Sequence, residues 1–162
     1  MDILLKDGVK YTLWTPTKEL EEFEPMVKYH IKDIFGDGCE YFPKQKLKTP
    51  ADTRSIPDGF VVNFQKKKWY IVELKLLCKD AINRISGQII DYKNAIKKDR
   101  TKREIYKAIK SIKDTDFLDD LIMDEQPDII VIINNLNGKL GERFREKVKG
   151  AEEKANIIEF KT

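Results

Sequence analysis

The sequence predicts an α/β domain in which α-helices flank a mixed β-sheet, built from a β-meander followed by crossover strands. A helical stretch precedes three closely spaced strand-like segments, and later helical segments alternate with two further strands. The continuous β-branched run Ile129–Ile133 is typical of a strand that is covered on both faces. Strands separated by helices return to the same sheet through crossover connections.

Length and composition favour one folded domain. The 162 residues are enough for a hydrophobic core, and no repeat or linker divides residues 1–162, so we expect a single domain. The net charge of +3 does not by itself indicate a nucleic-acid-binding protein. Two cysteines without a CxxC pair and a single histidine exclude zinc–thiolate and histidine-cluster sites. The chain has no long apolar run or signal peptide, so we expect a soluble cytoplasmic protein without membrane contact.

The first third combines a strand, a helix and a second strand. Residues 3–13 alternate polar and apolar side chains, which predicts an initial strand or strap. Thr15–Pro16 has the pattern of a helix N-cap followed by proline at the first helical position. Pro25 is expected to kink or restart the helix near Glu24, and Gly36–Gly38 to end it. The predicted apolar stripe of this helix comprises Leu20, Phe23, Val27, Ile31, Ile34 and Phe35.

A hairpin lies at the centre of the chain. Residues 40–47 alternate as a strand, and Pro43 places it at the periphery of the sheet. After a polar loop at 48–54, we expect a strand at Phe60–Phe64, a basic turn at Gln65–Lys68 and a longer strand at Trp69–Leu77.

Helices and two strands make up the rest of the chain. Residues 80–98 have helical spacing of the apolar positions. The inner face of that helix is expected to carry Ala81, Ile85, Gln88, Ile89, Tyr92 and Ile96. Further helices are predicted at 101–112, 115–123 and 139–149, and strands at 129–133 and 156–160.

Charged side chains interrupt the central hairpin. Asp58 stands at the mouth of its first strand, and Glu73 and Lys75 share one face of the second. The apolar residues Ile71 and Leu77 bracket these charges, so neither face is plainly solvated. Burying an ion costs several kcal/mol before pairing. A metal ion such as Mg²⁺, which prefers carboxylate and carbonyl oxygens, is a strong candidate to offset that cost.

Four motifs in this order resemble those of the PD-(D/E)XK nuclease superfamily. Ile56-Pro57-Asp58 and Glu73-Leu74-Lys75 match its signature, and Gln88-Ile89-Ile90-Asp91-Tyr92 matches a Gln-x-x-x-Tyr found on the helix that follows. Phe23-Glu24-Pro25-Met26-Val27 is similar to the glutamate motif of its first helix. The resemblance covers Glu24 to Tyr92 and implies a restriction endonuclease-like fold.

The resemblance implies a Mg²⁺-dependent deoxyribonuclease, for which Mn²⁺ substitutes, acting as an endonuclease in DNA repair or restriction. Asp58 and Glu73 would be metal ligands with the Leu74 backbone carbonyl, and Lys75 would handle the attacking water. The same resemblance makes Gln88 and Glu24 site residues, with Glu24 an outer or second-metal ligand. Glu21 is the alternative to Glu24, because Pro25 distorts the helical register. A double-strand break needs two active sites, which is compatible with a homodimer.

Simpler interpretations stay open. Asp58 in Pro-Asp-Gly is also ordinary turn chemistry, and Glu73 and Lys75 also fit a neighbouring ion pair. Tyr92 is expected either to contact substrate or to support its helix. A catalytically inactive module that binds nucleic acid or protein is the alternative function. The basic residues expected to contact phosphates are Lys44, Lys46, Lys93 and Lys97, with a solvated helix face as the alternative for those on helices.

Overall fold

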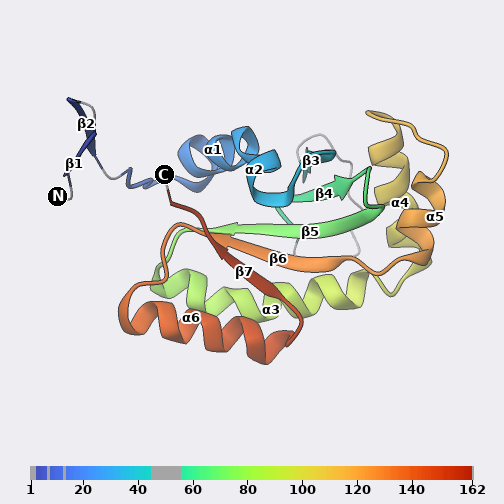
Figure 1. The fold of residues 1–162 in the computed structure, drawn as a ribbon. Coiled ribbons are helices and arrows are strands. Elements are labelled where there is room, and N and C mark those ends of the chain that lie inside the picture. Colours follow the sequence, from blue (N-terminus) through green and yellow to red (C-terminus); the bar gives the residue numbers. More distant parts are fainter. Residues whose placement is uncertain (1–2, 7, 13, 45–55, 162) are drawn as a thin grey trace.

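The computed structural model describes residues 3–6, 8–12, 14–44 and 56–161 (Figure 1). The fold is α/β, with a five-stranded mixed sheet in the order β3-β4-β5-β6-β7 and a separate two-stranded hairpin, β1-β2. The strands are β1 (Ile3–Lys6), β2 (Val9–Thr12), β3 (Cys39–Pro43), β4 (Gly59–Asn63), β5 (Lys68–Lys75), β6 (Asp128–Ile133) and β7 (Asn156–Glu159). The helices are η1 (Glu19–Phe23), α1 (Glu24–Tyr29), α2 (Ile31–Phe35), α3 (Lys79–Ala95), α4 (Asp99–Lys110), α5 (Leu118–Asp124) and α6 (Gly138–Ala151).

The first helical region differs from the prediction at its start. It begins at Glu19 rather than at Thr15–Pro16, because the backbone N–H groups of Thr17 and Lys18 donate to the Glu22 carboxylate at 2.7 and 3.1 Å. Its first turn is a π-helix, η1, and α1 restarts with Pro25 in its first turn, as the proline predicted. Gly36, at a φ of 95°, ends α2 as predicted.

The sheet has the predicted meander and crossovers. Strands β3, β4 and β5 pair antiparallel, and β5, β6 and β7 pair parallel. The β3 strand lies at the sheet edge, as Pro43 predicted, and ends at that residue. The rest of the predicted strand 40–47 beyond Lys44, including Lys46, lies outside the described residues.

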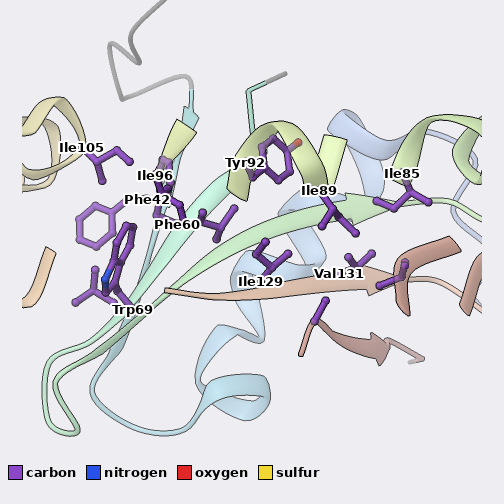
Figure 2. Close-up of a cluster of buried hydrophobic side chains, with 14 of the residues drawn as sticks. Phe42, Phe60, Trp69, Ile85, Ile89, Tyr92, Ile96, Ile105, Ile129 and Val131 are labelled. Atoms are coloured by element: carbon purple, nitrogen blue, oxygen red, sulfur yellow. The ribbon is translucent and has the colours of Figure 1, made fainter. Parts of the chain in front are cut away.

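Helices cover both faces of the sheet, as Figure 1 shows for α3 and α6 on one face and α1 and α2 on the other. Ile71 of β5 and Ile89 of α3 belong to the core on the α3 side, whereas Val72 and Leu74 pack in a second cluster with Val27 of α1. Tyr92, Ile89 and Ile85 follow one another along α3 above the sheet (Figure 2). None of the helices in the described ranges is long and apolar enough to cross a membrane.

Candidate active site

The candidate site lies where β4 and β5 diverge. Gly59 is opposite Val72 in the ladder, and Asp58 precedes it as β4 begins. The Asp58 Oδ2 atom accepts the backbone N–H of Leu74 at 2.7 Å, so a side-chain carboxylate continues the ladder. In an antiparallel pair a residue turns its N–H and C=O toward the same neighbour, so the Leu74 carbonyl faces the same gap as Asp58.

Glu73 is the centre of a buried hydrogen-bond network. It is 2% exposed and lies on the face of β5 that α3 covers. Lys75 Nζ lies 3.0 Å from Glu73 Oε1, and Gln88 Nε2 donates to the same oxygen at 3.1 Å. The Tyr92 hydroxyl donates to Glu73 Oε2 at 2.5 Å. Gln88 and Tyr92 are one helical turn apart on α3, so both side chains reach the same carboxylate.

Tyr92 supports the site rather than forming its surface. Its side chain is 1% exposed and packs in the core while its hydroxyl binds Glu73. Of the two expectations for Tyr92, support for its helix and the site fits this buried position. The hydrogen bond from a neutral phenol leaves the charge of Glu73 in place and fixes its orientation.

Burial and like charge control the electrostatics of Asp58. Burial, and then the nearby negative charge of Glu73, raise the pKa of Asp58 to about 7, against the opposing hydrogen bond from Leu74 and the charges of Lys75 and Lys44. Burial by itself would lower the pKa of Lys75, but the charge and hydrogen bond of Glu73, with smaller contributions from the charges of Glu19 and Asp58, raise it. The lysine is therefore a stable cation between acidic groups.

Glu19 is a site residue that the sequence did not single out. Its Oε1 atom accepts the backbone N–H of Leu76 at 3.1 Å, just beyond the end of β5, and its charge contributes to the raised pKa of Lys75. Glu21, the alternative to Glu24, is exposed and pairs with Lys18 at 2.7 Å. The run of acidic residues after Pro16 was the sequence signal that could have indicated a carboxylate here. The π-helical turn of η1 decides which of these carboxylates faces β5.

Glu24 does not join the other two carboxylates. It is 5% exposed and pairs through Oε1 with Lys28 Nζ at 3.2 Å. Within the described ranges, no three His, Cys, Asp or Glu side chains form a group that could hold a metal ion, so the predicted set of Asp58, Glu73 and Glu24 is not assembled. The helix carrying Glu24 covers the sheet face opposite the one toward which Glu73 points.

The two remaining acidic ligands fit a hydrated hard cation. Asp58 and Glu73 supply carboxylate oxygens, and the Leu74 carbonyl faces the same gap, which is the donor chemistry that Mg²⁺ and Mn²⁺ take with several retained waters. Two buried polar atoms close to these groups, Gln88 Oε1 and the Tyr41 hydroxyl, have no hydrogen-bond partner among the described residues. Both oxygens can accept hydrogen bonds from water.

The predicted phosphate-contacting lysines lie in different settings. Lys44 lies beside the site, since its backbone N–H donates to the Asp58 carbonyl at 3.0 Å. Lys93 pairs with Glu152 at 2.8 Å, as the interpretation of a solvated helix face expects. Lys97 is exposed and lines, with Lys93 and Glu152, a cavity of about 270 Å³ at the other end of β5.

An open cavity adjoins the site. Its volume is about 730 Å³, and its lining includes Glu19, Leu76, Cys78 and Asn134. Asn134 Oδ1 accepts the Leu77 backbone N–H at 2.8 Å, so the loop after β6 is fastened to the end of β5. The cavity therefore lies at the carboxyl ends of parallel strands, the usual ligand position in open α/β sheets.

Comparison with known proteins identifies no relative. No family model, curated protein or solved structure matches this chain. The interpretation of the site therefore depends on its own geometry.

Proposed function

We propose that this protein is a divalent-metal-dependent nuclease that hydrolyses DNA phosphodiester bonds at a PD-(D/E)XK-type site, with Mg²⁺ as the cofactor and Mn²⁺ as a substitute. The finer fold assignment, a restriction endonuclease-like fold, is part of the same proposal. The antiparallel meander, the parallel β6 and the position of Asp58 opposite Glu73 support it.

One observation carries the proposal. Asp58 and Glu73 are close enough that the charge of Glu73 raises the pKa of Asp58, in a site where Lys75 is the nearest cation. When Asp58 is ionised, two buried carboxylates beside one ammonium leave an excess of negative charge. A divalent cation would remove that excess, and a purely structural ion pair would not need Asp58 to be acidic.

Each residue has a distinct role in the proposed reaction. Asp58, Glu73 and the Leu74 carbonyl would hold the cation, which when bound supplies Lewis-acid stabilisation of the phosphate and of the leaving 3′ oxygen. Lys75 would orient the attacking water in line with the scissile bond and stabilise charge on the phosphate. Gln88 and Tyr92 hold Glu73 in one orientation, which keeps its position fixed during the reaction.

The surroundings suggest how DNA would be positioned. Lys44 is next to Asp58 and could contact the backbone beside the scissile phosphate. The cavity at Glu19 and Asn134 would take up one side of the substrate. Glu24 stands outside this set and is not proposed as a ligand.

The test is a cleavage assay. The protein is incubated with supercoiled, linear, single-stranded and branched DNA in Mg²⁺, Mn²⁺ or EDTA. We expect metal-dependent cleavage that Asp58→Ala and Lys75→Ala abolish, while Asp119→Ala, on the exposed side of α5, leaves it unchanged. Retained cleavage in the Lys75→Ala protein would contradict the proposed role of this site.

The alternative function has its own observation. Lys75, Gln88 and Tyr92 already satisfy the Glu73 carboxylate without a cation. A catalytically inactive module that binds nucleic acid or protein would keep such a closed network. DNA binding without cleavage on every substrate would favour that module over the nuclease.

A further inference from the structure

Tyr41 brings a third element, the edge strand β3, to the candidate site. It lies opposite Val61 in the β3–β4 ladder and packs with the cluster on the α1 side of the sheet. Its ring end lies directly over Gly59, where a Cβ atom would come within 2.5 Å of the Tyr41 hydroxyl oxygen. Only glycine, next to Asp58 in the sequence, allows this approach.

Negative charge acts on the Tyr41 hydroxyl, but no described residue forms a hydrogen bond with it. Burial, and then the charges of Glu24, Asp58 and Glu73, raise the pKa of Tyr41. The hydroxyl oxygen is nevertheless buried without a hydrogen-bond partner among the described residues. Leaving a buried polar group unpaired typically costs about 1–3 kcal/mol, which a bound ligand can recover.

A second buried atom shows what kind of ligand fits. Gln88 Oε1 is also unpaired within the described chain, although Gln88 Nε2 donates to Glu73. An amide oxygen only accepts hydrogen bonds, and a phenol oxygen accepts as well as donates. Two unused acceptors beside Asp58 and Glu73 call for a ligand that carries several strong donors. A hydrated divalent cation is such a ligand, because Mg²⁺ usually keeps several waters.

We propose that Tyr41 is a positioning residue whose hydroxyl oxygen accepts a hydrogen bond from a water of the hydrated cation bound at Asp58 and Glu73. This inference rests on the proposed metal site but not on DNA cleavage. Tyr41 would hold the cation's hydration shell from the α1 side of the sheet, while Gln88 would hold it from the α3 side. Lys28, which lies 5.6 Å from the Tyr41 ring centroid and pairs with Glu24, keeps the ring in place.

The test measures binding of Mn²⁺ alone, without DNA. The amount of free Mn²⁺ is followed by its electron paramagnetic resonance signal for the wild type, Tyr41→Phe and Tyr70→Phe. Tyr70 is a matched control, because it is a half-buried tyrosine on the same sheet face whose pKa is influenced by Asp128 and not by Asp58 or Glu73. We expect Tyr41→Phe to weaken Mn²⁺ binding about tenfold and Tyr70→Phe to leave it unchanged.

Stability in EDTA separates this role from a structural one. Tyr41→Phe removes an unpaired buried hydroxyl and keeps the shape of the ring, so its urea midpoint should equal or exceed that of the wild type. Equal Mn²⁺ affinity of Tyr41→Phe and wild type would overturn the inference, as would a wild type that binds no Mn²⁺. A Tyr41→Phe protein that loses EDTA stability along with affinity would overturn it too. Absent DNA cleavage with normal Mn²⁺ binding counts against the nuclease proposal only.

Discussion

At both ends of β4 a side-chain oxygen accepts backbone N–H groups, but the two side chains differ in charge. At the hairpin turn, Asn63 Oδ1 accepts the backbone N–H groups of Gln65 and Lys66 at 3.1 and 2.9 Å. At the other end, Asp58 Oδ2 accepts the N–H of Leu74 at 2.7 Å. A neutral amide is sufficient at the turn. At the diverging end the acceptor is a carboxylate, and burial and the charge of Glu73 disfavour its ionised form. The extra charge at Asp58 therefore needs an explanation that hydrogen bonding does not provide.

The largest effect should come from replacing Asp58 with asparagine, which gives both ends of β4 a neutral amide. Asp58→Asn keeps an oxygen that can accept the Leu74 N–H but removes the charge. We expect metal-dependent DNA cleavage to fall on the order of a thousandfold, because a metal ligand contributes several kcal/mol to the transition state. The measurement is the initial rate of plasmid cleavage. Cleavage within tenfold of the wild type would mean that Asp58, like Asn63, only completes the hairpin.

The next effect concerns the network at the diverging end. Glu73→Ala leaves Lys75 buried without its partner at 3.0 Å, which should lower the free energy of unfolding by about 3 kcal/mol. Urea denaturation in EDTA measures this loss. Glu73→Gln is the control, since its amide oxygen can still accept the Tyr92 hydroxyl and should cost less. If both variants match the wild type, the network does not contribute to stability.

A third effect is the pH dependence of stability in EDTA. The pKa of Asp58 is raised to about 7 in the folded protein and is about 4 in an unfolded chain, so folding favours its protonated form. The contribution of Asp58 is complete below about pH 4 and is lost as the pH rises to about 7, by at most about 1.4 kcal/mol per pH unit. The stability difference between wild type and Asp58→Asn should follow this profile in urea titrations. A difference that stays constant from pH 4 to pH 8 would contradict the raised pKa.

The smallest effect should come from the turn end. Asn63→Ala removes the acceptor of two backbone N–H groups and should cost about 1 kcal/mol in the free energy of unfolding. It should leave Mn²⁺ affinity and DNA cleavage unchanged, because Asn63 lies at the far end of β4 from Asp58. Urea denaturation and Mn²⁺ titration of the same sample check both points. Loss of Mn²⁺ binding would show that the two ends are coupled.

Local periodicity explains why much of the site could be predicted. Glu73 and Lys75 share a face because side chains alternate along β5, and Gln88 and Tyr92 share a face because they are one turn apart on α3. The β-branched run predicted β6 as a buried strand, and five of its six residues are buried. Each of these predictions needs only the geometry of one element.

The predictions that failed depend on how elements meet. Thr15–Pro16 was expected to start the first helix, but the Glu22 carboxylate binds the backbone at Thr17 and Lys18 instead. The π-helical turn then places Glu19 against Leu76, while Glu24 pairs with Lys28. Helical spacing alone could not predict this, because one π turn shifts the position of every later side chain around the helix.

By itself, the sequence determined the α/β class, the order of the elements and the placement of Glu73 with Lys75 and Gln88, since all of these follow from short-range patterns and one hairpin. Only the tertiary structure decided that Glu19 reaches β5, that Tyr92 is buried beneath Glu73, and that Tyr41 approaches Asp58 over Gly59. These contacts join side chains from separate layers of the fold. Their distances depend on how the helices and the edge strand pack on the sheet, which no local pattern encodes.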